Sequence, residues 1–175
     1  MEALKGFEIP ITSLQIGTHN FEYIVQNDFL KAFEAAYDRG KFEVKILFEK
    51  KHSMLEVDFN INGYIETACD RCMEDIKLPI TNTRTLIFKY AEEAREEEEI
   101  VYLKMGQTEV NLSKFIYEFI MLAIPLKKVK DCELDDYKDC NQKILDVLDD
   151  ISVEEEAEES ALSKALKEIN LNQNK

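Results

Sequence analysis

Residues 41–67 of the chain read KFEVKILFEKKHSMLEVDFNINGYIET and carry the clearest structural signal in the sequence. Apolar and polar residues alternate through 41–50 and again from 54 to 67, the period of two that is typical of a strand with one buried face. The polar residues 51–53 separate the two runs, which predicts a turn between paired strands. Within the second run, Asn62-Gly63 predicts a bulge or a turn.

The same alternation recurs on both sides of this stretch. Short alternating runs lie at 7–11 and 19–25, and further strands are expected at 78–90 and 100–103. A run of glutamates at 96–99 interrupts the pattern between the last two strands. Five or six strands with short connections predict an antiparallel meander that has one face on the core and one face in solvent.

Two segments change to helical spacing. Residues 27–37 predict a helix with Asn27 or Asp28 at its N-cap. Residues 112–124 carry apolar side chains almost all around the helix they would form, so this helix is expected to be the most buried element. The expected fold is therefore α+β: a curved antiparallel sheet of five to six strands, barrel-like if it closes, packed against one buried helix and flanked by a second.

Charge is distributed unevenly over the 175 residues, whose formal net charge is −14. Six glutamates against one arginine give residues 91–100 a charge of −5, and eight acids against two lysines give 131–150 a charge of −6. Six acids against three lysines give 151–175 a charge of −3. We therefore expect a single, nearly neutral α+β domain over 1–130, followed over 131–175 by an acidic loop and a helical, partly mobile tail.

Composition excludes several classes of protein. With 45% hydrophobic residues, 10 Phe and 7 Tyr, the main part of the chain is not disordered by composition. The sequence contains no apolar run of ~18 residues and no apolar signal-peptide core at its start, so a cytoplasmic protein without membrane contact is expected. None of the glycine-rich phosphate-binding motifs occurs, and no small-molecule substrate or catalytic activity is implied.

Cys69 and Cys72 form a Cys-x-x-Cys motif between two expected strands. A tight turn can direct both sulfurs to one centre, which is half of a tetrahedral zinc site. Cys132 and Cys140 would supply the other half, because the chain can return beside the turn after the buried helix. Two alternatives stay open: free thiols, and a redox pair, although a reactive Cys-x-x-Cys usually opens a helix rather than following a strand.

Basic residues could form a local patch in spite of the acidic total. RNA binding through phosphate contacts requires cations clustered on one face. The candidate RNA-binding residues are Lys50, Lys51, Arg71, Arg84, Lys127, Lys128 and Lys130. The alternative is that these side chains are only part of a solvated surface.

Four features occur in a characteristic order. They are the 7–11 strand followed by Gly17 and Phe21-Glu22-Tyr23, the Cys69–Cys72 turn, the acidic insertion before 100–103, and the segment from Asn111-Leu112-Ser113 to Pro125. In this order they resemble the YceD family, described as large ribosomal RNA subunit accumulation proteins. The resemblance spans about residues 5–130.

The resemblance implies a role in the accumulation or maturation of 23S rRNA without a recognised catalytic activity. The expected protein is then a non-catalytic factor that binds pre-ribosomal RNA or a basic ribosomal protein. An alternative is an acidic adaptor that binds only proteins, suggested by the net charge of −14 and by Leu162, Leu166 and Ile169 in the tail. A third possibility, an enzyme with Cys69 or Cys72 as nucleophile, lacks a base partner in the sequence.

Overall fold

The computed structural model describes residues 2–34, 36–130 and 140–151. These residues group into two compact units. The larger unit lies within 1–67 and 76–128, and the smaller one joins the turn 68–75 to the segment that begins at residue 129. In the smaller unit residues 142–151 are helical, where apolar spacing in the sequence predicts a helix over 142–148, and Leu145 is buried. The rest of the expected loop and tail, 131–139 and 152–175, lies outside the described residues.

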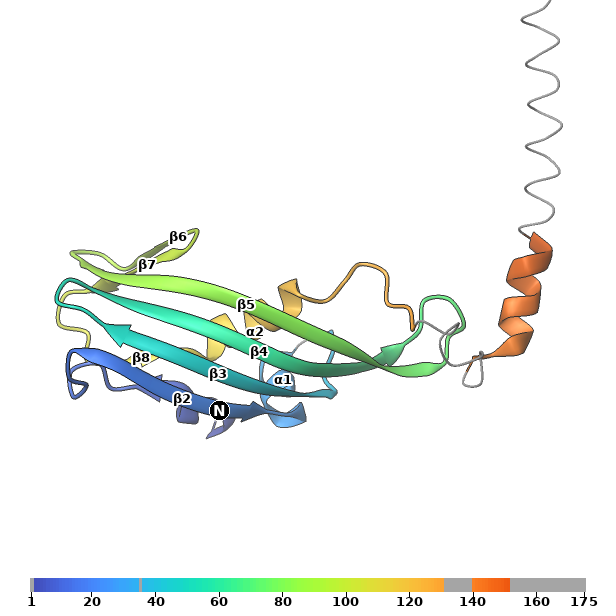
Figure 1. Cartoon of the computed structure of the whole chain (residues 1–175), viewed down its shortest axis with the longest axis horizontal. Coiled ribbons are helices and arrows are strands. Elements are labelled where there is room, and N and C mark those ends of the chain that lie inside the picture. Colours follow the sequence, from blue (N-terminus) through green and yellow to red (C-terminus); the bar gives the residue numbers. More distant parts are fainter. Residues whose placement is uncertain (1, 35, 131–139, 152–175) are drawn as a thin grey trace, which may run out of the picture. The chain divides into compact units, whose positions relative to one another are not determined.

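The larger unit is built on a six-stranded sheet in the order β2-β3-β4-β5-β7-β6 (Figure 1). The strands are β2 (Gly17–Val25), β3 (Gly40–Lys50), β4 (Met54–Ala68), β5 (Asp75–Ala91), β6 (Arg95–Glu97) and β7 (Ile100–Lys104). The sheet is open, with β2 and β6 at its two edges. The α+β class is therefore confirmed, and the sheet is curved without closing into a barrel.

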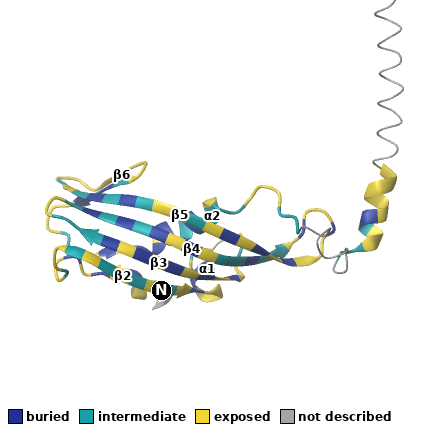
Figure 2. Cartoon of the chain, viewed as in Figure 1, coloured by how far each residue is buried: buried dark blue, intermediate teal, exposed yellow. Residues whose placement is uncertain are grey.

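The alternating pattern in the sequence sets the register of the central strands. Ile46 on β3 pairs with Phe59 on β4, and Phe48 pairs with Val57, so apolar side chains of both strands share one face. The intervening residues lie on the other face and are mostly polar, with Leu47 as an exposed apolar exception. Figure 2 shows this alternation as bands of buried and exposed residues along each strand. A slip of one residue would expose the whole apolar set, which fixes this pairing.

Helix α2 (Ser113–Leu122) covers the apolar face of the sheet. The ring of Phe119 lies 5.2 Å from that of Phe59, and the two rings meet edge to face. Before the helix, the Asn111 side-chain oxygen accepts hydrogen bonds from the Ser113 backbone N–H at 2.9 Å and from its hydroxyl at 2.6 Å. These bonds satisfy donors at the start of the helix. The buried helix expected at 112–124 is confirmed.

Shorter elements close the flank of the larger unit. They are the 3-10 helix η1 (Glu2–Phe7), the strands β1 (Glu8–Ile9) and β8 (Val110–Asn111), which pair with each other, and helix α1 (Asn27–Ala32). Phe29 on α1 packs against Phe7, with ring centroids 4.9 Å apart. Phe33, just after α1, stacks on Tyr117 of α2 at 4.4 Å. Aromatic contacts therefore join this flank to the main core.

Helix α1 differs from its expected form. It ends at Ala32 rather than at residue 37, and Glu34 adopts a left-handed backbone conformation with φ of 52° that stops the helix. Its N-cap is Gln26. Asn27, expected as a cap, instead accepts a hydrogen bond from the Gly40 N–H at 2.9 Å. A tertiary contact has therefore replaced the local capping role.

The sheet departs from the expected antiparallel meander at one pair of strands. β7 pairs in parallel with β5, with Ile87 opposite Ile100. The chain leaves β5, runs back as the edge strand β6, and then reverses at Glu98, whose φ is 47°. β7 therefore inserts between β5 and β6 and runs in the direction of β5. The 96–99 segment that interrupts the sequence pattern includes the turn of this hairpin.

The expected bulge or turn at Asn62-Gly63 was wrong. β4 continues through both residues, and Gly63 pairs with Phe42 on β3. A Cβ atom at Gly63 would lie 2.7 Å from the Phe42 Cα atom. Glycine is therefore required here because the two backbones approach closely, and not because the chain turns.

Candidate functional site

Cys69 and Cys72 lie in the tight turn between β4 and β5, which belongs to the smaller unit. Both side chains are buried and neither forms a disulfide. The Cys69 N–H donates to the Glu74 carbonyl at 2.8 Å, and the Met73 N–H donates to the Cys69 carbonyl at 2.9 Å. Met73 has a φ of 64°, which reverses the chain. Two backbone bonds and a left-handed residue thus hold the two thiols in one small turn.

The surroundings of Cys69 favour its thiolate. Burial raises the pKa of the Cys69 thiol through desolvation, but the backbone N–H groups of Cys72 and Arg71 donate toward its sulfur. The backbone N–H of Lys130 and the side chain of Cys72 do the same, and the net effect lowers the pKa of Cys69 below its ordinary value. Hydrogen bonds to a sulfur stabilise its charged form, which is the form that binds metals. The turn therefore fits a thiolate ligand pair.

The contact with Lys130 brings the segment after α2 to this turn within the smaller unit. Cys132 follows Lys130 by two residues, and two residues span at most about 7 Å. Cys132 itself lies outside the described residues, and Cys140 is half-buried and forms no disulfide. Among the described residues, no three Cys, His, Asp or Glu side chains gather closely enough to hold a metal. The four-cysteine set therefore stays a prediction.

Two of the seven candidate RNA-binding residues are engaged inside the larger unit. The Lys50 ammonium donates to the carbonyls of Ile11 and Leu14 at 2.7 and 2.8 Å, which fastens the loop before β2 to the end of β3. Lys51 pairs with Glu49 at 3.1 Å and with Glu56 at 2.5 Å. The Lys50 ammonium is thus held by two backbone carbonyls, and the charge of Lys51 is offset by two carboxylates.

The other five candidates come from separate parts of the fold. Arg84 on β5 and Lys127 after α2 are exposed, and Lys128 follows Lys127 in the larger unit. Arg71 and Lys130 belong to the smaller unit. These five therefore come from two parts of the larger unit and two segments of the smaller one, and the role of the whole set in RNA binding stays a prediction.

The face of the sheet opposite α2 is polar and solvent-exposed. Its centre holds a shallow depression of about 460 Å³ lined by side chains of β2 to β5 such as Glu22, Lys45, Asp58 and Asn60. The Thr85 hydroxyl donates to the Asp58 carboxylate at 2.5 Å beside it. Acidic and basic groups alternate here, so this face has no dominant charge.

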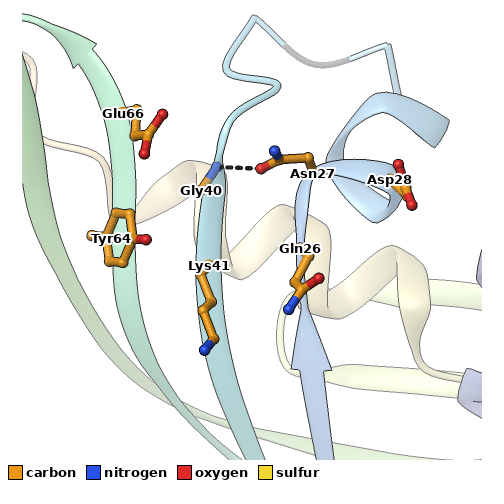
Figure 3. A pocket seen from close by; sticks show the side chains of 7 residues that line it. All are labelled: Gln26, Asn27, Asp28, Gly40, Lys41, Tyr64 and Glu66. Atoms are coloured by element: carbon orange, nitrogen blue, oxygen red, sulfur yellow. Dashed lines mark hydrogen bonds between the residues drawn. The ribbon is translucent and has the colours of Figure 1, made fainter.

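A second hollow of about 310 Å³ lies beside the start of α1 (Figure 3). Figure 3 shows Tyr64 and Glu66 on β4, Lys41 on β3 and the Asn27–Gly40 hydrogen bond between α1 and β3. The Lys77 ammonium lies 4.8 Å from the centroid of the Tyr64 ring and 3.8 Å from the Glu66 carboxylate. Asn27, Tyr64 and Glu66 in this hollow are thus engaged by other protein groups, as in a structural contact.

The largest of the three hollows is a groove of about 610 Å³ between the β6–β7 hairpin, β8 and the start of α2, which we call the hairpin groove. Its floor is apolar and consists of Phe88, Val101, Leu103, Val110 and Phe115. At its mouth the Lys114 ammonium on α2 contacts the Glu96 carboxylate on β6 at 2.7 Å. This hydrogen bond raises the pKa of Lys114. Next to it the Arg95 guanidinium lies 4.0 Å from the centroid of the Tyr102 ring.

Sequence reasoning missed the hairpin groove, because its walls come from segments that are separated in the chain. The available signals were an acidic run directly before a short apolar strand, and the Asn111-Leu112-Ser113 motif that opens the buried helix. The glutamate run interrupts the strand pattern of the sequence, whereas in the structure Arg95–Glu97 form an exposed edge strand. Among the described helices, none has the length and apolar character needed to cross a membrane.

Comparison with known proteins agrees with the features that the sequence displays. A family model described as large ribosomal RNA subunit accumulation protein YceD matches residues 57–170. No curated protein and no solved structure matches the chain. The matched range covers well over half of the sequence, including the cysteine turn, the hairpin groove, α2 and both distal cysteines. The chain therefore belongs to the YceD family of large ribosomal RNA subunit accumulation proteins.

Proposed function

We propose that this chain promotes the accumulation of 23S rRNA by binding a component of the maturing large ribosomal subunit in the cytoplasm. It acts as a binding protein and not as an enzyme. Membership of the YceD family supports the ribosomal role. The observation that carries the binding role is the hairpin groove, an apolar hollow bordered by an acidic segment.

The surroundings of the groove favour a basic ribosomal protein over RNA as the partner. Residues 92–118 contain eight acids and three bases, so an RNA phosphate backbone is repelled there. A ribosomal protein with Lys and Arg residues is attracted by the same field. The groove also supports binding over catalysis, because the hydroxyl of its Ser113 donates to Asn111 and not to a histidine.

Pre-ribosomal RNA is the second candidate partner, and the exposed side chains of Arg84 and Lys127 support it. An RNA contact made by these residues predicts affinity that falls steeply with salt and does not depend on the groove. The acidic adaptor differs from both, since it would bind proteins without any effect on ribosomal RNA.

We also propose that Cys69, Cys72, Cys132 and Cys140 hold a structural zinc ion. The buried Cys-x-x-Cys turn and the backbone donors around Cys69 support this, because thiolate ligands need such hydrogen bonds to offset their charge. Four-thiolate coordination closes the site, so the metal would join the turn 68–75 to the segment after residue 129 and would carry no reaction. Metal content separates zinc from the other two alternatives, free thiols and a redox pair, and those two differ in whether a disulfide forms under air.

Depletion of the protein from its cells tests the ribosomal role. We expect the ratio of 23S to 16S rRNA to fall, because large subunits that lack an assembly contact are degraded, and a plasmid copy of the wild-type chain should restore it. The ratio is measured on total RNA by electrophoresis. An unchanged ratio after full depletion contradicts the proposed function and favours the adaptor.

A further inference from the structure

We propose that the hairpin groove binds an extended, basic segment of a partner protein, with apolar side chains on its floor and Lys or Arg side chains on its acidic rim. Only the ribosomal identity of that partner rests on the proposed function. The floor, the rim charge and the open edge of β6 each contribute to this inference.

The floor of the groove suits apolar side chains. Five buried apolar residues from β5, β7, β8 and α2 surround it. Its volume of about 610 Å³ falls within the range of roughly 300–1,000 Å³ that is usual for ligand pockets. A floor of this kind favours the binding of several small aliphatic side chains, whereas a charged phosphate backbone gains little stabilisation from it.

The charged residues that line the groove itself are Arg95, Glu96 and Lys114, whereas the residues on either side of β6, which we call the rim, carry an excess of negative charge. Within the described part of the chain, the carboxylates of Glu92, Glu93, Glu98 and Glu99 have no ion-pair partner. They flank β6 on both sides, and all four side chains are exposed. A cationic segment laid along the hairpin therefore meets carboxylates before and after the groove, which accelerates its association.

The ion pair at the mouth shows where a partner's cation binds. Lys114 contacts Glu96 at 2.7 Å and Glu118 at 3.8 Å, and the side chains of Lys114 and Glu96 are each 51% exposed. Its ammonium occupies the position that a Lys or Arg of the incoming segment would take. Lys114 thus competes with the partner for the Glu96 carboxylate, whereas Glu96 attracts the partner's cation.

The edge of the sheet favours an extended partner. β6 is the last strand of the sheet, so its outer backbone groups are available to a further strand. Charged residues on such an edge usually prevent pairing between copies of a protein. Here the edge carries Arg95, Glu96 and Glu97 beside the four unpaired glutamates, so it repels a second acidic copy and admits a basic strand.

The same charges disfavour the other occupants. The C-terminal residues 151–175 contain apolar side chains at helical spacing but carry a net charge of −3. A second copy of the chain carries −14, and RNA is a polyanion. Each of these is repelled by the rim, whereas a basic protein segment is attracted to it.

Two substitutions with opposite expected effects test the inference. The probe is a short fluorescein-labelled peptide in which lysine alternates with valine and threonine, and its affinity for the full chain is measured by fluorescence anisotropy. Glu96→Gln removes the attracting charge and should weaken binding about threefold, while Lys114→Gln removes the competitor and should strengthen it about threefold. Both residues are exposed, so both variants should fold, which circular dichroism checks.

The controls distinguish binding at the hairpin groove from non-specific attraction of a basic peptide to an acidic protein. The double variant Glu22→Gln/Glu43→Gln removes two exposed charges from the opposite face of the sheet and should leave the affinity within about twofold of wild type. A peptide with glutamate in place of lysine should not bind. Chemical shift changes on titration should centre on Tyr102 and Phe115.

Several results would overturn the inference. If Glu96→Gln and Lys114→Gln weaken binding equally, the ion pair only holds the groove in shape. If the wild-type chain binds an RNA oligonucleotide at the groove, or does not bind the basic peptide at low salt, the groove does not bind a basic protein segment. None of these results changes the 23S to 16S ratio expected on depletion, so failure of this inference is distinguishable from failure of the proposed function.

Discussion

The variant Gly63→Ala is expected to lose about 3 kcal/mol or more of its free energy of unfolding. Gly63 lies in the central strand β4, opposite Phe42 of β3. A Cβ atom there would lie 2.7 Å from the Phe42 Cα atom and would also overlap the Lys41 carbonyl. Because both contacts involve backbone, no rotamer change relieves them, and β3 would have to separate from β4 in the middle of the core.

Urea unfolding followed by circular dichroism measures this loss. The matched control is Gly6→Ala, since an added Cβ at Gly6 has nothing within 4 Å. The control should stay within about 0.5 kcal/mol of wild type. A Gly63→Ala variant as stable as the control would contradict the close approach of β3 and β4 described here.

The second large effect concerns the metal. Protein purified without chelators should contain about one zinc ion per chain, and Cys72→Ser should contain almost none. Loss of one thiolate from a closed four-thiolate site removes a quarter of the coordination shell in a turn that cannot replace it. Mass spectrometry of the purified protein for metals, combined with titration of the free thiols, measures both quantities.

The control for the metal is His52→Ala, which removes an exposed side chain of a metal-binding type from the β3–β4 turn and should keep the zinc content. Absence of zinc from the wild-type protein, with all four thiols reacting freely, would exclude the metal and leave the free-thiol alternative. A disulfide between Cys69 and Cys72 after isolation under air would instead indicate the redox pair.

The strands were predictable because their signal is local. Alternation over residues 41–50 and 54–67 gives β3 and β4 almost to the residue, since one face of each strand is buried by the same core. The apolar run at 112–124 likewise gives α2. The alternation determines both the type and the buried face of the two strands, whereas the apolar run of α2, which surrounds almost the whole helix, predicts its burial.

Features that depend on contacts distant in sequence were not predictable. The Asn27 side-chain oxygen accepts a hydrogen bond from the Gly40 N–H instead of capping α1. The Lys50 ammonium donates to the carbonyls of Ile11 and Leu14 instead of facing solvent. The parallel pairing of β7 follows from the reversal at Glu98, which nothing in the alternation indicates. A local sequence pattern does not indicate which distant residue will form a hydrogen bond or pair with a given side chain or strand.

The candidate site was predicted only in part. The Cys-x-x-Cys turn is a local motif, so its position between two strands followed from spacing alone. The hairpin groove has walls from β5 to α2 and could not be read from any one segment. The sequence correctly indicates that residues 92–99 are acidic, but it does not indicate that they border an apolar hollow.

Rescue of the rRNA ratio in depleted cells tests whether the hairpin groove is needed for 23S rRNA accumulation. The groove variant combines Glu92→Lys, Glu93→Lys and Ala94→Arg, and the control combines Glu22→Lys, Glu43→Lys and Thr81→Arg on the opposite face, with the same change in charge and with all six positions exposed. We predict that the control restores the 23S to 16S ratio and that the groove variant, folded and expressed equally, does not. If the groove variant restores the ratio to the wild-type level, the hairpin groove is not needed for 23S rRNA accumulation and the proposed role of the groove is wrong.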